Sequence, residues 1–170
     1  MALRLDLGCG RNPRSGYIGV DLRDYGQTVV ADLRAPWPWA DDSVEDVHCS
    51  HFLEHLTAVE RMHFVNELYR VLVPGGSCRL IVPHWASAIA YGDLTHQWPP
   101  VSEYWFFYLS KSWRERNAAH NDIYQCDFDT QWTYSLHQNI VQQSPDYQQH
   151  AALFWKEACQ EIIATLVARK

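Results

Sequence analysis

The sequence predicts an α/β protein with a mostly parallel sheet covered by helices, and three observations support this fold class. Short, continuous apolar runs recur through the first half of the chain, as in strands that are buried on both faces. An amphipathic helix over residues 58–72 separates two of these runs. Glycine and proline residues mark the turns between them. Strands and helices that alternate in this order form a parallel sheet.

Five strands are predicted in the first half, each a short apolar run bounded by turn residues. The sequence PGG at 74–76 is expected to end the helix that precedes the fifth strand. Because few residues separate the first three strands, we expect loops or single helical turns there, and one thinly covered face of the sheet. The five strands cover residues 3–7, 17–22, 28–33, 44–50 and 77–83.

The second half begins with an irregular segment over residues 85–100, which carries turn and proline signals. An aromatic helix is predicted over residues 101–116, with Ser102 as its cap. Residues 122–137 are expected to supply one or two strands, with a turn near 127–130, and to include the antiparallel last strand of the sheet.

The end of the chain is predicted to be one long helix that starts at Ser144. Ser144 at the cap and Pro145 in the first turn form an N-terminal signature. This helix is expected either to cover the thinly covered face or to pair two subunits, so a homodimer is a further expectation. Its predicted buried stripe consists of Tyr147, Phe154, Ala158, Ile162 and Leu166.

Length and composition indicate a globular protein. The 170 residues suffice for one hydrophobic core, so a single domain over residues 1–170 is expected. The net charge of −6 argues against unspecific nucleic-acid binding. No apolar stretch is long enough for a membrane span, and no signal peptide is expected. Five cysteines without a CxxC pair indicate neither a disulfide framework nor a zinc knuckle, and favour the cytoplasm.

The stretch LDLGCGRNPRSGYIGVDL, residues 5–22, places a glycine turn between two strands and an acid, Asp21, at the end of the second. Dinucleotide-binding turns need a third glycine and an acid about 20 residues further on. Here Pro13 takes the position of the third glycine, and Asp21 follows Gly10 by only eleven residues. This spacing argues against a nicotinamide oxidoreductase and favours a ligand without a pyrophosphate, such as S-adenosylmethionine.

The segment LDLGCG resembles motif I of the class I S-adenosylmethionine-dependent methyltransferases. The similarity continues in order through GYIGVDL, VVADL, PWPWADDSVEDVHCSHFLEHL and ELYRVLVPGG, which together span about residues 3–84. These blocks resemble the small methyltransferase-11-like branch of that family. The resemblance implies a Rossmann-like class I fold, S-adenosylmethionine as cofactor and methyl transfer as the activity. It also implies a cofactor-binding half at 1–84 and a substrate-side half at 85–170.

The resemblance also implies roles for individual residues in cofactor binding. Arg11 is proposed for the cofactor's carboxylate because a guanidinium binds a carboxylate through two hydrogen bonds. Alternatively Arg11 is a solvated loop charge, Asp6 only binds turn amides, and Glu54 and His55 only cap and orient the following helix. The implied contacts are Asp6, Gly8, Cys9 and Gly10 at the methionine end, Asp21 at the ribose, Asp32 and Leu33 at the adenine, and Ser50 and His51 near the sulfonium.

Catalytic groups of a doubly wound sheet lie outside the carboxyl ends of its strands. His84 follows the fifth strand, and AYGDLTHQW, which holds Asp93 and His96, resembles a D-x-T-H segment of relatives of this branch. His84 or His96 is predicted to take the acceptor's proton, with Asp93 orienting an imidazole. The alternative is that Asp93 and Thr95 only close a loop through hydrogen bonds to the backbone.

The expected reaction transfers a methyl group to a small-molecule or saccharide-type acceptor and leaves S-adenosylhomocysteine. The alternative is a cofactor-binding module or partner subunit with little catalysis of its own. A nucleic-acid acceptor is disfavoured because QWPPV at 97–101 departs from the motif of amino-methylating DNA enzymes. No HxH or HExxH spacing occurs, so no metal is expected. The alternative is an ion held by His51, His84, Asp93 and His96.

Overall fold

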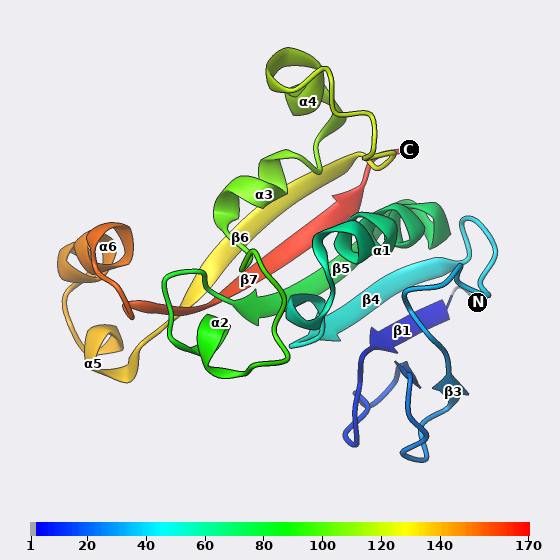
Figure 1. The fold of residues 1–170 in the computed structure, drawn as a ribbon, viewed down its shortest axis with the longest axis horizontal. Helices are drawn as coiled ribbons and strands as arrows, with labels where there is room; N and C mark the ends of the chain where they lie inside the picture. Colours follow the sequence, from blue (N-terminus) through cyan, green and yellow to red (C-terminus); the bar gives the residue numbers. More distant parts are fainter. Residues whose placement is uncertain (1–2) are drawn as a thin grey trace.

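A seven-stranded sheet organises the chain in the computed structural model, which describes residues 3–170 (Figure 1). The strand order is β3-β2-β1-β4-β5-β7-β6, and the first five strands pair in parallel. β7 is antiparallel to both of its neighbours. The predicted α/β class and Rossmann-like fold are therefore confirmed. The strands are β1 (Leu3–Leu7), β2 (Ile18–Asp21), β3 (Val29–Val30), β4 (Val44–Ser50), β5 (Leu72–Pro83), β6 (Phe128–Leu136) and β7 (Cys159–Ala168).

Six α-helices and one 3-10 turn complete the described part of the chain. No helix within residues 3–170 combines the length and the hydrophobicity that a membrane crossing requires. The turn η1 spans Leu53–His55, and the helices are α1 (Ala58–Val71), α2 (Ile89–Gly92), α3 (Glu103–Phe107), α4 (Lys111–Asn117), α5 (Gln138–Val141) and α6 (Pro145–Phe154).

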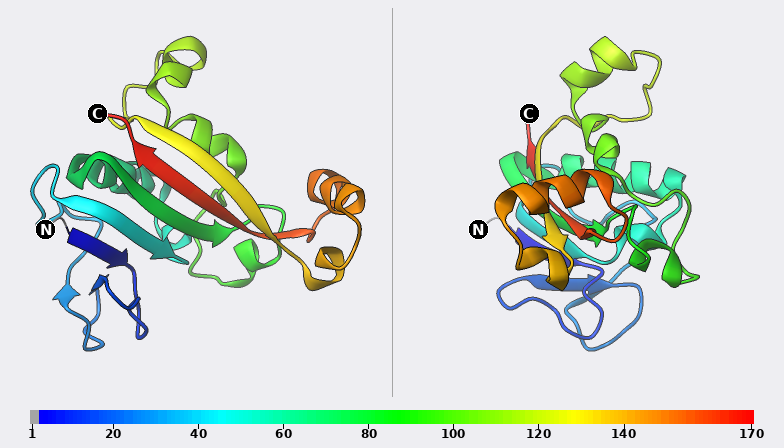
Figure 2. Two further views of the ribbon diagram at one scale, coloured as in Figure 1. Left: turned by 180° about the vertical axis from the view of Figure 1, so that it is seen from behind. Right: turned by 90° about the vertical axis from the view of Figure 1, so that its left-hand side faces the viewer.

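The two faces of the sheet differ in their cover. Helices α1 and α3 lie over one face (Figure 1), whereas the strands are uncovered when seen from behind (Figure 2, left). The covered face holds the core, in which Phe64 of α1 and Phe106 of α3 are fully buried. On the opposite face the side chain of Asp46 accepts hydrogen bonds from Tyr17 and Ser77 and pairs with Arg4. These polar side chains suit the open face to contact with solvent. The short connections between the first three strands predict such a thinly covered face.

In the first half of the chain, the observed helix and strands agree closely with those predicted from the sequence. Helix α1 begins at a capping box, in which Thr57 and Glu60 bind each other's backbone amides. It ends at Val71, within one residue of the prediction. PGG does not form its C-cap as expected, because the chain turns at Leu72 into β5 and the glycines lie inside that strand. The third strand is shorter than predicted and keeps only Val29–Val30.

The predicted long C-terminal helix is wrong. Helix α6 begins at Pro145 with Ser144 as its cap, as expected, but it ends at Phe154, and the chain continues as β7. The predicted stripe does not form, because Phe154 is 71% exposed, whereas Ile162 and Leu166 are buried on a strand. β7 also replaces residues 122–137 as the antiparallel strand next to β5. The helix therefore does not cover the open face.

The predicted aromatic helix over 101–116 divides into α3 and α4. The break lies at Leu109, whose carbonyl accepts a hydrogen bond from the Phe128 amide at 2.9 Å and so joins the chain to the start of β6. Ser102 occupies the cap position of α3, but its side chain makes no capping hydrogen bond. Residues 122–137 give one strand, β6, which begins at Phe128 within the predicted turn.

A buried arginine of α1 joins the turn after β4 to the loop before α3. Arg61 is 5% exposed, and its guanidinium donates to four backbone carbonyls. Burial lowers the pKa of Arg61, while the nearby Glu54 carboxylate raises it. The four carbonyls belong to Leu53, Glu54, Gln97 and Pro99.

Replacing this arginine should destabilise the fold. Arg61→Met keeps apolar bulk but leaves buried carbonyls without donors, so the free energy of unfolding should fall by about 2–4 kcal/mol. Urea denaturation followed by circular dichroism measures the change. Arg116→Met, which replaces an exposed arginine of α4, is the matched control and should stay within about 0.5 kcal/mol of the wild type. Equal stability of the two variants would contradict the role of Arg61.

Candidate active site at the carboxyl edge of the sheet

The glycine turn after β1 has a backbone that only glycine adopts without strain. Gly8 and Gly10 have φ angles of 68° and 55°. A Cβ on Gly8 would lie 2.6 Å from the ring of Phe52, whereas nothing lies within 4 Å of a Cβ on Gly10. Gly8 therefore packs against the segment after β4, and the backbone at Gly10 is open to a ligand.

Two carboxylates hold this turn in place. Asp21 accepts from the Gly10 amide at 2.9 Å and from the Arg23 amide at 3.1 Å. Asp6, which is 4% exposed, accepts from the Arg14 amide at 2.7 Å and lies 2.9 Å from Nδ1 of His48. Both Asp6 oxygens thus bind groups of the chain itself, which agrees with its alternative role of binding turn amides.

An apolar cavity of 160 Å³ lies on the other side of Phe52, whose ring packs against Gly8 of the glycine turn. Asp32 lies at this cavity, but Arg34 holds its carboxylate at 2.8 and 2.9 Å. Hydrogen bonds from Arg34 also lower the pKa of Asp32. A ligand's amino group would share this carboxylate with Arg34. The cavity is lined by Leu22, Ala31, Asp32, Leu33, Arg34, Phe52, His55 and Leu56.

The predicted residues Cys9 and Arg11 lie in the same turn. Cys9 is half-buried, and burial, followed by the charges of Asp6 and Asp21, raises the pKa of its thiol. Arg11 is exposed, and its guanidinium carbon lies 5.5 Å from the centre of the Tyr25 ring. This contact places Arg11 at the outer side of the turn.

The end of β4 carries a charged histidine. His51 follows Ser50 with a φ of 52°, and its amide donates to the carbonyl of Ile81 in β5. Its ring lies 3.2 Å from Glu54 and 2.8 Å from Glu161. The hydrogen bond with Glu54, then that with Glu161, raises the pKa of His51 to about 9 against the cost of burial. His51 is therefore a cation at neutral pH.

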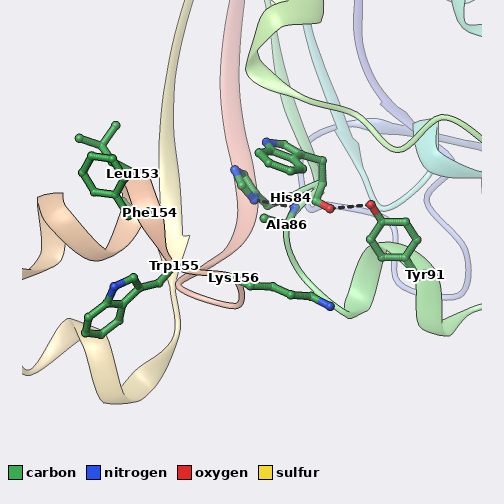
Figure 3. A pocket seen from close by; sticks show the side chains of 9 residues that line it. His84, Ala86, Tyr91, Leu153, Phe154, Trp155 and Lys156 are labelled. Atoms are coloured by element: carbon green, nitrogen blue, oxygen red, sulfur yellow. Dashed lines mark hydrogen bonds between the residues drawn. The ribbon is translucent and has the colours of Figure 1, made fainter.

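A second and larger pocket, of 390 Å³, opens next to the end of β5 (Figure 3). Its walls come from the segment after β5 and from the end of α6 and the residues that follow. Aromatic rings dominate its lining, and one cation, Lys156, lies among them. The lining residues are His84, Trp85, Ala86, Tyr91, Ala152, Leu153, Phe154, Trp155 and Lys156.

His84 at this pocket is oriented by Glu103, a residue that the sequence did not identify. Nε2 of His84 lies 2.7 Å from Glu103, and its Nδ1 accepts from the Ala86 amide at 3.1 Å. The indole of Trp85 also donates to Glu103, at 3.1 Å. Burial alone would raise the pKa of Glu103, but the hydrogen bond from His84 and further hydrogen bonds lower it to about 2. Glu103 is therefore an anion that fixes both His84 and Trp85.

The predicted residues Asp93 and His96 lie near each other but apart from His84. Asp93 accepts from the amide and the hydroxyl of Thr95, at 2.8 and 2.7 Å, which agrees with the loop-closing alternative. His96 Nε2 lies 4.0 Å from Asp93, and the His96 ring lies 4.9 Å from that of His55. The acid that orients His84 is therefore Glu103 and not Asp93. Separation along the chain hid this pair, because neither residue lies in a motif with the other.

Comparison with known proteins finds one family model and several solved structures that are similar to this chain. A family model described as a methyltransferase domain matches residues 5–80. A SAM-dependent methyltransferase from Archaeoglobus fulgidus has a TM-score of 0.69 at 17% identity, covering 98% of this chain and 86% of that chain. Phosphoethanolamine N-methyltransferase 2 from Haemonchus contortus, in complex with S-adenosyl-L-methionine, has a TM-score of 0.52 at 16% identity, covering 100% of this chain and 49% of that chain.

A chain from the complex between the Haloferax volcanii Trm112 methyltransferase activator and a putative methyltransferase is also similar in fold. Its TM-score is 0.51 at 14% identity, covering 99% of this chain and 82% of that chain. At such identities these structures show the fold that this chain shares. None of the curated protein sequences matches the chain at a significant level.

Substituting Gly8 should impair ligand binding at the turn. The Cβ in Gly8→Ala would meet the Phe52 ring at 2.6 Å in a backbone conformation with positive φ, so affinity for S-adenosylhomocysteine should fall about tenfold or more. Isothermal calorimetry measures the affinity. Gly92→Ala is the matched control, because nothing lies within 4 Å of a Cβ at Gly92. Wild-type affinity in Gly8→Ala would contradict the proposed role of the turn.

The ion pairs of His51 should make stability depend on pH. Because its folded pKa is about 9 and its ordinary value is 6.5, their contribution is complete below about pH 6.5 and is lost as pH rises through about 9. Since the side chain is 45% exposed, solvent screening limits the effect to about 1 kcal/mol. Urea denaturation at pH 6.5 and 9 should show this loss in the wild type and a smaller one in His51→Gln. Parallel pH profiles would refute it.

Proposed function

We propose that the chain is a class I methyltransferase, the type that uses S-adenosylmethionine, and that it methylates a small-molecule or saccharide-type acceptor bound in the pocket beside His84. The observation that carries this proposal is the position of the 390 Å³ aromatic pocket. It lies at the end of β5, on the edge of the sheet where the glycine turn and His51 also lie. Catalytic sites of such sheets form at this edge.

The residues around the glycine turn suit the cofactor. The 160 Å³ cavity offers apolar walls and one carboxylate, Asp32, which fit a flat ring that carries an amino group. Asp21 lies at the end of β2, beside the open backbone of Gly10, where it is suited to the ribose. Asp6 and Cys9 would hold the turn in its shape. Ser50 and the charged His51 would lie at the end of the cavity that is nearest to β5. Arg11 would reach the carboxylate by leaving the ring of Tyr25.

The pocket chemistry favours an acceptor with both apolar and polar faces. Trp85, Tyr91 and Trp155 provide aromatic surfaces on which a sugar or a planar group can stack. Lys156 supplies a positive charge for an anionic group of the acceptor. A structure of the Haemonchus contortus enzyme contains phosphomonomethylethanolamine, a phosphate-bearing compound. This supports including phosphorylated acceptors in a search.

When bound, S-adenosylmethionine supplies a methyl group that is already activated, so the protein's task is chiefly to align the acceptor. His84 is the residue that we assign to the acceptor's proton, because Glu103 fixes its ring at the pocket wall. An acceptor hydroxyl or amine would replace the Ala86 amide at Nδ1 and give its proton to that atom. His96 and Asp93 do not line this pocket, so the proposal gives the proton to His84 alone.

Formation of S-adenosylhomocysteine in a pool of sugars, sugar phosphates and small amines tests the proposal. Trp155→Ala and Lys156→Ala should raise the KM for the acceptor about tenfold, while the affinity for S-adenosylhomocysteine stays unchanged. Tyr104→Ala and Lys111→Ala are matched controls, since both residues are exposed and lie outside the pocket. His84→Gln should lower kcat more than it raises KM.

Calorimetry with S-adenosylhomocysteine, beside an Asp21→Ala variant, separates the outcomes. Binding without turnover in any acceptor pool would favour the alternative function, a cofactor-binding module or partner subunit. Turnover with an unchanged acceptor KM in Trp155→Ala would place the acceptor elsewhere.

The proposal also concerns the compartment, the binding partner and the oligomeric state of the protein. All five cysteines are free, which suits a reducing compartment such as the cytoplasm. The partner that we propose is the small acceptor. A homodimer stays an expectation that size-exclusion chromatography with light scattering can test.

A further inference from the structure

Three potential metal ligands meet beside the cofactor cavity. Glu54 and His55 belong to η1, the turn after β4, and His96 lies in the loop after α2. One donor atom from each residue lies within 4.8 Å of the others. The two imidazole rings are 4.9 Å apart and nearly perpendicular, at 76°. Two imidazoles and a carboxylate form a donor set typical of zinc and related divalent ions.

The partner of His96 determines which of its nitrogens carries the proton in the neutral ring. Nδ1 of His96 lies 3.2 Å from the carbonyl of Ala90 in α2. A carbonyl only accepts hydrogen bonds, so Nδ1 carries the hydrogen and Nε2 keeps a lone pair. This lone pair is available to a metal ion.

A relay of hydrogen bonds orients His55 in the same way. The Thr95 hydroxyl donates its one proton to the Asp93 carboxylate at 2.7 Å. The hydroxyl oxygen must therefore accept from Nδ1 of His55, which lies 3.0 Å away. Nε2 of His55 is left with its lone pair. Metal-binding histidines in proteins commonly have such a partner on the second ring nitrogen.

Glu54 supplies an independent indication of a ligand. Its side chain is 4% exposed, and one oxygen, Oε1, lies 3.2 Å from His51. The other oxygen, Oε2, is buried and has no hydrogen-bond partner among residues 3–170. A buried carboxylate oxygen without a partner is costly, and a bound cation would remove that cost. The hydrogen bonds of Arg61 in this region go to carbonyls and leave this oxygen free.

We propose that Glu54, His55 and His96 bind a divalent metal ion of the zinc type, with a coordination position left open. Asp93, whose Oδ2 lies 4.0 Å from Nε2 of His96, adds a second negative charge beside the site. The charge of Glu54 offsets the positive charges of His51 and Arg61 nearby. The D-x-T-H segment thus acts through Thr95 and His96 in metal binding.

The ion would join two parts of the active site. His55 lines the 160 Å³ cavity that we assign to the cofactor. His96 is anchored to Ala90, and the next residue, Tyr91, lines the 390 Å³ pocket. A metal at this position would hold the loop after β5 against the turn after β4, between the two pockets.

Titration of the purified chain with Co²⁺, followed by its visible d–d absorption, tests the site without any turnover. One equivalent of Co²⁺ should bind, and Zn²⁺ should displace it. Glu54→Gln and His96→Ala should each lower the affinity more than about 100-fold, and Thr95→Val should lower it about 10- to 100-fold because His55 loses its orienting partner. His120→Ala is the matched control, an exposed histidine outside the cluster, and should bind as the wild type does.

Circular dichroism shows for each variant that the fold is intact. The proposal fails if the wild type binds no Co²⁺ or Zn²⁺, or if His96→Ala binds Co²⁺ as tightly as His120→Ala. It also fails if the spectrum shows thiolate-to-cobalt charge transfer, because a cysteine would then be the ligand. None of these outcomes depends on the acceptor, so methyl transfer and metal binding are tested separately.

Discussion

The parallel pairing of β1, β4 and β5 is the constraint on which the site depends. Parallel strands end at the same edge of a sheet, so the segments after these three strands meet there although they lie far apart in the sequence. The antiparallel β7 starts at that edge and places Glu161 opposite Pro83, from where it reaches His51. The pairing of these strands thus brings together the glycine turn, a charged histidine, a wall of the larger pocket and the side of the smaller cavity that Phe52, His55 and Leu56 form.

Buried charges then fix the segments that the ladder brings together. Arg61 directs its donors to carbonyls of the turn after β4 and of the loop before α3, which keeps those two segments in contact. Because these donors are used on the backbone, Glu54 keeps one oxygen without a partner. Glu103 has the opposite role, since its anion takes hydrogen bonds from His84 and Trp85 and so fixes one wall of the larger pocket. At this edge, Arg61 therefore holds the fold together, whereas Glu54 and Glu103 lie at the sites proposed for ligands.

Local sequence patterns predict the first half of the fold, but in the second half they miss the last strand for a physical reason. Continuous apolar runs define β1, β2, β4 and β5, and a spacing of three and four residues defines α1. In the last segment Ala158, Ile162 and Leu166 recur every four residues, which is also a multiple of the strand period of two. Ala164 and Ala168 fill the alternate positions and are buried as well, so the period is that of a strand.

At the site as well, contacts within one sequence motif are predicted, whereas contacts between distant segments are not. The glycine turn and Asp21 belong to one contiguous motif, and the structure brings them together as the sequence predicts. The pairs His84–Glu103 and His51–Glu161, and the cluster of Glu54, His55 and His96, join residues of different segments. No spacing rule identifies them, because the tertiary fold alone creates these contacts.

The glycine turn also explains why a short connection suits this ligand class. Asp21 and Asp6 already accept two amides of the turn, at Gly10 and Arg14, so these donors are not free for a pyrophosphate, and the two carboxylates would repel its charge. A sulfonium cofactor without phosphates meets neither obstacle. It also needs no helix N-terminus behind the turn, and the connection between β1 and β2 contains none within the described residues.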